Sequence, residues 1–177
     1  MKYCAFLRGV NVKGTAMKMA DVVEVFKKQG LINVSSVLAT GNILFESEEN
    51  PLKLRKMLEK ALSEHFDYEA FLFLKTDVQV KDIFENSPFQ KAENLHIYSF
   101  VCENGDENIL LEEFQKANHQ EDEEAKIVNQ NFYWKIPQGN TLDSSFGKIL
   151  GKKYFKDKFT SRNINTIEKI VNKFSTL

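Results

Sequence analysis

Three features of the sequence predict an α+β fold. Short, mainly apolar runs such as residues 2–7 and 70–74 have the length and composition of buried strands. Longer segments between them carry apolar residues at helical spacing, and pairs of β-rich runs flank short polar turns. With 42% hydrophobic and 28% charged residues, the chain has the composition of a folded globular protein, and its 15 phenylalanines predict aromatic-rich packing.

The first half of the chain shows the order strand, helix, strand, strand, helix, strand. Between the second and third strands, Gly41-Asn42 suits a tight hairpin turn because glycine accepts a positive φ. Asn50-Pro51 is typical of a capped helix start. This order is the split βαβ pattern of ferredoxin-like folds. The expected elements are residues 2–7, 22–30, 34–39, 43–45, 51–62 and 70–74.

The second half of the chain repeats this order. Its hairpin turn, Asn129-Gln130-Asn131, follows the first hairpin turn by about 90 residues, a spacing that indicates duplication. The expected elements are a linking helix over 77–86, then residues 95–102, 109–117, 126–128, 132–136, 142–150 and 159–161. A C-terminal helix is expected to open at Asn165, with Glu168 at capping-box spacing. We therefore predict tandem ferredoxin-like modules, the first in residues 1–76 and the second, with its flanking helices, in residues 77–177.

The sequence shows no motif for metal binding or catalysis. Its three histidines are isolated, and neither a nucleophile elbow nor a Walker A loop occurs. Cys4 and Cys102 lack CxxC spacing and are expected to be buried, reduced thiols. No apolar run approaches the roughly 20 residues of a membrane span, and the N-terminus does not look like a signal peptide. We expect a cytoplasmic protein without metal or cofactor. Because no catalytic motif is identified, the sequence favours a protein that is not an enzyme but leaves the question open.

Charge is unevenly distributed along the chain, although the net charge is only −1. Residues 103–124 contain nine acidic side chains and one lysine, whereas residues 147–177 contain eight basic and two acidic ones. Such runs are usually solvated faces. The alternative is a basic patch near the C-terminus that binds an anionic partner.

The strongest functional signal is the polar turn that follows the first strand, Arg8-Gly9-Val10-Asn11. In the split βαβ topology, the end of this strand and the hairpin tip emerge at the same edge of the sheet, beside the N-terminus of the first helix. Backbone N–H groups at a helix N-terminus favour an anion, and an arginine can add a forked contact. The alternative is that these polar groups only tie the loop to the hairpin. The candidate ligand-binding residues are Arg8, Asn11, Lys18, Thr40, Asn42, Arg162 and Asn163.

Several of these residues belong to motifs that resemble a known family. The motifs are Tyr3-x-x-Phe6-Leu7-Arg8-Gly9-Val10-Asn11-Val12-x-Gly14, Thr40-Gly41-Asn42-Ile43-Leu44-Phe45 and Thr160-Ser161-Arg162-Asn163-x-Asn165-Thr166. Together they resemble the bacterial family called domain of unknown function 1697. The resemblance implies a cytoplasmic α+β protein of two ferredoxin-like modules. It implies no activity, cofactor or catalytic residue.

Two other functions compete with anion binding. Ferredoxin-like modules include RNA readers that present aromatic side chains on an open sheet face, and the available aromatics are Phe45, Phe71, Phe73 and Trp134. Nucleic-acid binding is disfavoured, because strands such as Ala70–Leu74 are apolar on both faces and the basic-aromatic signature of these readers is missing. A protein-interaction module steered by the charged segments is the other possibility. The sequence does not indicate an oligomeric state.

Overall fold

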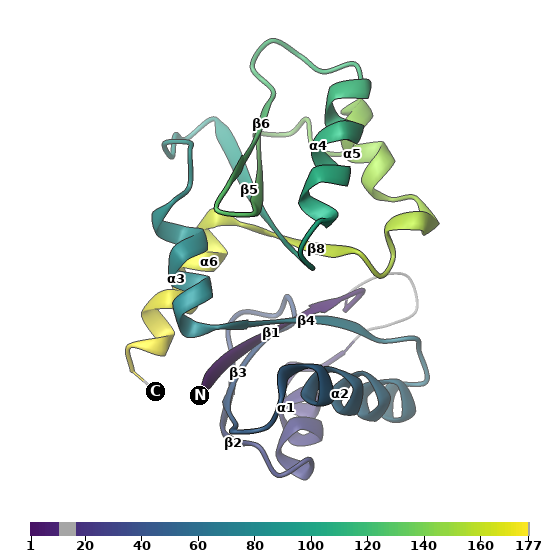
Figure 1. Ribbon diagram of the computed structural model, residues 1–177, viewed down its shortest axis with the longest axis vertical. Coiled ribbons are helices and arrows are strands. Elements are labelled where there is room, and N and C mark those ends of the chain that lie inside the picture. Colours follow the sequence, from purple (N-terminus) through teal and green to yellow (C-terminus); the bar gives the residue numbers. More distant parts are fainter. Residues whose placement is uncertain (11–16, 177) are drawn as a thin grey trace. The chain divides into compact units, whose positions relative to one another are not determined.

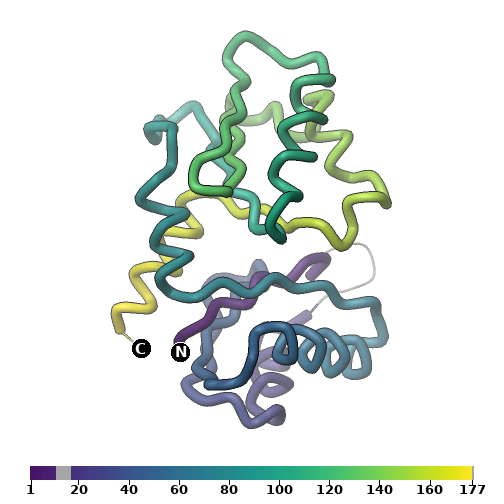
Figure 2. Tube along the Cα trace, in the orientation of Figure 1, coloured from purple at the N-terminus to yellow at the C-terminus, as the bar shows by residue number. Residues whose placement is uncertain are grey.

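The computed structural model describes residues 1–10 and 17–176 as two compact units, each built on a four-stranded antiparallel sheet (Figures 1 and 2). The first unit comprises residues 1–81 and 168–177, and the second comprises residues 82–167. The predicted α+β class is confirmed. Among the described residues, no helix is both long enough and apolar enough to cross a membrane.

The first sheet has the strand order β2-β3-β1-β4. The helices α1 and α2 cover one of its faces (Figure 1). The core beneath these helices includes Tyr3, Ala5 and Leu7 of strand β1. The predicted start of the second helix is confirmed: Asn50 Oδ1 accepts a hydrogen bond from the Leu52 N–H at 2.9 Å, and proline follows the cap. The elements are β1 (Lys2–Arg8), α1 (Met19–Lys28), β2 (Ile32–Ser36), β3 (Asn42–Glu46), α2 (Pro51–Phe66) and β4 (Phe71–Thr76).

The second sheet has the equivalent strand order, β6-β7-β5-β8. Its core is rich in aromatic rings, as the phenylalanine content predicts. The Phe146 ring centroid lies 5.2 Å from that of Trp134 and 5.3 Å from that of Phe114. The elements are β5 (Leu95–Cys102), α4 (Asp106–Lys116), β6 (Glu124–Val128), β7 (Asn131–Pro137), α5 (Ser145–Leu150), the 3₁₀ turn η1 (Lys153–Phe155) and β8 (Phe159–Asn163).

Local signals locate the second hairpin correctly but misplace the start of α5. Asn129 and Gln130 have φ values of 49° and 62°, so the predicted turn between β6 and β7 adopts the left-handed conformation. The helix expected from Leu142 begins only at Ser145, because the Ser144 Oγ caps it by accepting a hydrogen bond from the Gly147 N–H at 2.8 Å. Leu142 precedes the helix and is 85% exposed.

The chain is divided into the two units within two further helices, α3 (Asp77–Glu85) and α6 (Ile164–Phe174). The prediction that Asn165 caps α6 is wrong. The helix begins at Ile164, and the Asn163 Oδ1 accepts a hydrogen bond from the Asn165 N–H at 2.9 Å. Asn163 therefore supplies the acceptor expected of a cap, whereas Asn165 already lies inside the first turn.

Candidate functional site

The end of β1 lies beside the tip of the β2–β3 hairpin, as the split βαβ topology predicts. Phe6 pairs with Asn42 in the antiparallel ladder, and the Leu7 N–H donates a hydrogen bond to the Gly41 carbonyl at 2.8 Å. Gly41 has a φ of +74°, and a Cβ at this position would lie 2.5 Å from the Cγ2 of Val10. The hairpin thus contacts the residues that follow β1 as closely as a glycine allows.

The side chain of Asn42 stabilises this turn by hydrogen bonds. It is fully buried, and its Nδ2 donates hydrogen bonds to the Val37 carbonyl and to the Thr40 Oγ1, both at 2.9 Å. The sequence placed Asn42 in the turn, but it is the first residue of β3, and Leu38 and Gly41 take the positive φ values instead. Asn42 and Thr40 are therefore brought together, with a structural role in the hairpin.

Two cationic candidates lie on either side of the loop between β1 and α1. Arg8 is half-buried at the last position of β1, opposite Phe71 of β4, and the next residue, Gly9, has a φ of 76°. Lys18 is exposed at the N-cap of α1, in an extended conformation. The intervening candidate Asn11 lies outside the described residues.

The described residues flanking this loop are anchored in one core. Val10 and Met17 are both buried in the apolar cluster that contains Leu7. Among the described residues, the N-cap of α1 is Lys18, and its side chain accepts no hydrogen bond from the N–H groups of the first turn. Both ends of the Arg8–Lys18 segment are therefore held by the first unit, next to N–H groups of α1 that the Lys18 side chain does not cap.

Arg162 and Asn163 lie in the second unit, at the end of β8. Arg162 is only 8% exposed, and its Nη1 donates to the Thr160 Oγ1 and to the Ser161 carbonyl, both at 2.8 Å. The Asn163 Nδ2 lies 3.1 Å from the His96 Nδ1. These contacts stabilise the β8–α6 junction, and the idea that both residues join the Arg8 site stays a prediction.

The aromatic residues considered for base stacking are mostly core residues. Phe45, Phe73 and Trp134 are at most 1% exposed, and Phe71 is half-buried. The Trp134 Nε1 donates a hydrogen bond to the buried Glu123 carboxylate at 3.0 Å. Because a base needs an accessible ring face, the three buried rings do not form a nucleic-acid platform.

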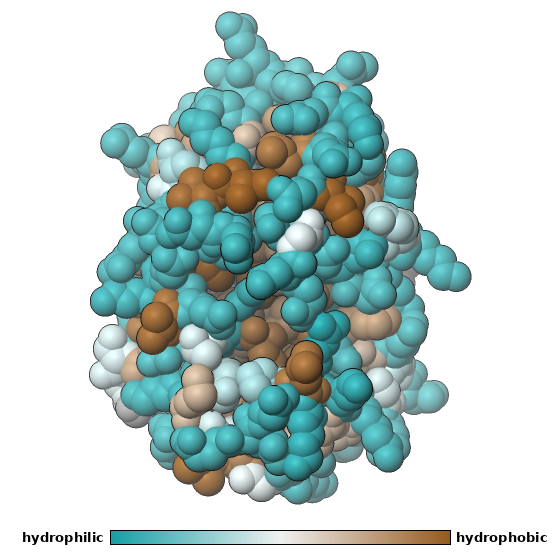
Figure 3. All heavy atoms as spheres, viewed as in Figure 1, coloured by the Kyte–Doolittle hydropathy of each residue, from teal (hydrophilic) through white to brown (hydrophobic). Residues whose placement is uncertain are grey.

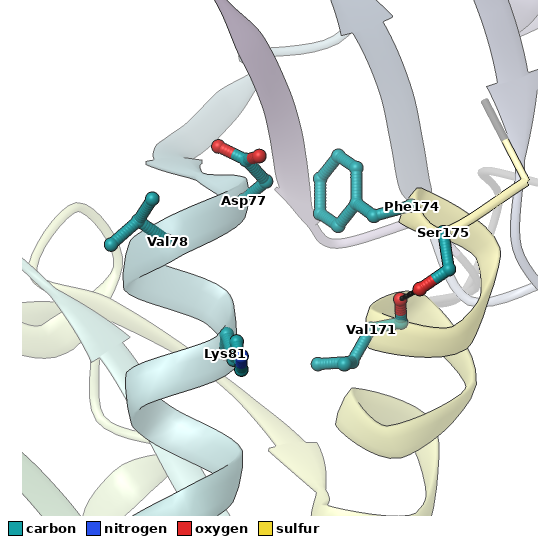
Figure 4. Close-up of a pocket in the computed structure, with 6 residues that line it drawn as sticks. All are labelled: Asp77, Val78, Lys81, Val171, Phe174 and Ser175. Atoms are coloured by element: carbon teal, nitrogen blue, oxygen red, sulfur yellow. Dashed lines mark hydrogen bonds between the residues drawn. The ribbon is translucent and has the colours of Figure 1, made fainter.

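Sequence reasoning missed a groove between α3 and α6 within the first unit. The groove has a volume of about 230 Å³, and Val78 on its rim is 72% exposed (Figure 4). Its one hydroxyl belongs to Ser175 and donates to the Val171 carbonyl at 3.5 Å, so it is used inside α6. The feature of the sequence that could have indicated this groove is Val78, an apolar residue in the segment that forms α3. The lining residues are Asp77, Val78, Lys81, Val171, Phe174 and Ser175.

Polar side chains cover most of the face drawn in Figure 3, and apolar residues gather in separate patches. Within residues 1–10 and 17–176, no cluster of three or more His, Cys, Asp or Glu side chains could hold a metal ion. Cys4 and Cys102 are both buried, and their sulfur atoms are not joined in a disulfide. The edge of the first sheet therefore stays the candidate site, with Arg8 and Lys18 as its charged groups.

Comparison with known proteins assigns the chain to a family. Residues 1–133 match the family described as "Protein of unknown function (DUF1697)", and the chain belongs to this family. Its fold is similar to that of the conserved bacterial protein SP0830 from Streptococcus pneumoniae, with a TM-score of 0.77 and 22% sequence identity over 97% of each chain. No curated protein matches the sequence.

Proposed function

We propose that this member of the DUF1697 family binds a small anionic ligand where β1 ends, with Arg8 and Lys18 as the charged contacts. The observation that carries the proposal is the N-terminus of α1. Helices usually have Ser, Thr, Asp or Asn at the N-cap, whose side chain accepts a hydrogen bond from the first turn. Here the N-cap is Lys18, whose ammonium group is a donor only, so its side chain accepts no hydrogen bond from the first turn. An anion would satisfy the N–H groups and pair with the lysine.

Arg8, the last residue of β1, also favours anion binding at this position. Its guanidinium can form a forked pair of hydrogen bonds with a phosphate or carboxylate. Thr40 and Asn42 then stabilise the turn of the hairpin, because Asn42 donates hydrogen bonds to Val37 and Thr40 within it. The adjacent Gly41 carbonyl accepts the hydrogen bond that joins this turn to β1. Asn11, Arg162 and Asn163 remain candidate contacts on the basis of sequence alone.

The proposed activity is binding rather than catalysis. The candidate set consists of arginine, lysine, asparagine and threonine side chains, and none of these is a general base near neutral pH. Such a set can hold and orient an anion. It offers no group to move a proton in a reaction.

Thermal unfolding in the presence of inorganic phosphate or sulfate, at constant ionic strength, tests the proposal. At ten times its Kd a ligand stabilises the folded state by about 1.4 kcal/mol, which raises the Tm of a chain of this size by about 3–6 °C. Arg8→Gln and Lys18→Gln should reduce this rise. Lys28→Gln, which removes one charge from the opposite end of α1, is the matched control and should keep it.

Two results would contradict the proposal. One is a Tm that responds to none of the anions tried. The other is an equal rise in the wild type, the Arg8→Gln and Lys18→Gln variants, and the Lys28→Gln control.

We further propose that each unit has a ferredoxin-like fold and that the chain divides into modules at residues 1–76 and 77–177. The strand orders β2-β3-β1-β4 and β6-β7-β5-β8 support the first point. A cytoplasmic location is proposed because both cysteines are buried and are not joined in a disulfide, as is common in a reducing compartment. Fractionation of cells that produce the protein would test the location, and recovery from a secreted fraction would contradict it.

A further inference from the structure

Five lysines are concentrated in residues 148–158 of the second unit, which we call the lysine segment. Asp157 is its only acidic residue, so the segment carries a charge of +4 in a chain whose net charge is −1 (five lysines minus one aspartate). It consists of the end of α5, η1 and the turn before β8. The lysines are Lys148, Lys152, Lys153, Lys156 and Lys158.

Four of these lysines face solvent. Lys148, Lys152, Lys153 and Lys156 are exposed. The ammonium groups of the first three form no hydrogen bond or ion pair with any residue that the structure describes. Lys148, Lys152 and Lys153 therefore present positive charge that no described residue neutralises by a hydrogen bond or an ion pair.

The backbone of the lysine segment is anchored in the second core. Phe155 is 2% exposed, and its ring centroid lies 5.7 Å from that of Phe159. Lys153 and Lys156 are three residues apart around the 3₁₀ turn, a spacing that places side chains on the same side. The buried ring thus anchors the backbone from which the neighbouring lysine side chains extend.

An exposed aromatic ring lies among these lysines. Tyr154 is 60% exposed, although its ring contacts Phe155 and the Lys158 Nζ lies 4.8 Å from its centroid. Tyrosine in this position offers a flat surface to a partner. A base can stack on such a ring while the surrounding ammonium groups bind phosphates.

Acidic residues border one end of the segment. The Lys158 Nζ lies 4.0 Å from the Asp106 carboxylate at the start of α4. Burial raises the pKa of Asp106, and the neighbouring Asp157, Glu103 and Glu107 raise it further while Lys158 lowers it. A polyanion is repelled from this end, which leaves the positions from Lys148 to Lys156 for its phosphates.

We propose that the lysine segment binds single-stranded nucleic acid without sequence preference, with phosphates on Lys148, Lys152, Lys153 and Lys156 and one base on Tyr154. An exposed aromatic ring among lysines favours a nucleic acid over an acidic protein, which has no base to stack. An unpaired strand is required because a duplex hides its base faces. The surface belongs to the second unit and does not depend on the Arg8 site.

Fluorescence anisotropy of a labelled oligothymidylate of about 20 nucleotides tests the proposal, at NaCl concentrations between about 50 and 200 mM. Four phosphate contacts predict a slope of log K against log[NaCl] of about −2.8 for a single strand. The double variant Lys152→Gln/Lys153→Gln should bring the slope to about −1.4. Lys27→Gln/Lys28→Gln on α1 is the matched control, because it removes two adjacent lysines from the first unit and should leave the slope unchanged.

The tyrosine provides a second, independent readout. Tyr154→Ala should weaken binding about tenfold, the scale of one lost base stack, whereas Tyr154→Phe should retain affinity. All substituted side chains are largely exposed, and thermal unfolding followed by circular dichroism checks that each variant folds.

Three outcomes would overturn the proposal. The first is no anisotropy change at the lowest salt concentration. The second is the same slope in the Lys152→Gln/Lys153→Gln variant as in the wild type and the control. The third is binding to phosphatidylserine vesicles that depends on Lys152 and Lys153 while the oligonucleotide does not bind, which would assign the segment to a membrane surface.

Discussion

Replacing Gly41 by alanine tests how closely the hairpin packs against the end of β1. A Cβ at Gly41 would lie 2.5 Å from the Val10 Cγ2 and 2.9 Å from the Leu7 Cβ. Both neighbours are buried, at 5% and 1% exposure, so neither can move freely. Gly30 is the matched control, because it has a similar φ of +80° but nothing lies within 4 Å of its Cβ position.

The comparison separates backbone strain from steric overlap. A non-glycine residue in the left-handed region costs about 1–2 kcal/mol at either position. Overpacking in a close-packed site adds about 1–3 kcal/mol, and only Gly41 meets it. Gly41→Ala should therefore lower the free energy of unfolding by about 2–5 kcal/mol, and Gly30→Ala by about 1–2 kcal/mol. The smaller entropy of the unfolded alanine chain offsets both values equally.

Urea unfolding measures this difference, provided that each unit is followed by a suitable probe. Trp134 is the only tryptophan and lies in the second unit, so its fluorescence reports that unit, while far-ultraviolet circular dichroism reports both. Coincident transitions would show that the units unfold together. Equal midpoints for Gly41→Ala and Gly30→Ala, with equal slopes, would refute the steric argument.

Two further predictions concern the first unit. Burial raises the pKa of Tyr68 to about 12, and the Glu59 carboxylate adds to the rise. Because the folded state keeps this proton longer than the unfolded state, the contribution of Tyr68 to stability is complete below about pH 10 and is lost as the pH rises toward 12. In urea titrations at several pH values, Tyr68→Phe should reduce the fall in the free energy of unfolding between about pH 10 and 12. It should not destabilise the protein at pH 7, because the buried hydroxyl has no hydrogen-bond partner in the described structure; a clear loss there would contradict this view. Asn50→Ala should lower the free energy of unfolding by about 1 kcal/mol, because the Oδ1 that accepts from the Leu52 and Lys53 N–H groups is removed. An unchanged urea midpoint would show that water replaces the cap at no cost.

Short-range chemistry explains what could be predicted from the sequence. Apolar runs and helical spacing indicated the α+β class because these patterns report which faces are buried. The Asn50-Pro51 start of α2 and the Asn129-Gln130 turn depend on the backbone preferences of adjacent residues. The interactions at this helix start and at this turn span only a few positions, so the sequence was sufficient to predict both features.

Helix starts that depend on competing caps were predicted less well. Ser144 and Asn163 supply the acceptors at the starts of α5 and α6, although Leu142 and Asn165 looked like suitable first residues. Each segment offers several polar side chains within one turn of the helix start. The choice among them depends on which neighbour the core buries, such as Ile164 at 4% exposure.

The sequence by itself determined the α+β class and the polar turn after β1, because both depend on patterns within about ten residues. Only the tertiary structure decided which groups the described candidate site residues contact. The amide of Asn42, a predicted ligand contact, is buried and donates hydrogen bonds to Val37 and Thr40 in the hairpin. Arg162 likewise turned out to be buried against Thr160. A side chain's role depends on which groups surround it in space, and those groups come from the folding of the chain.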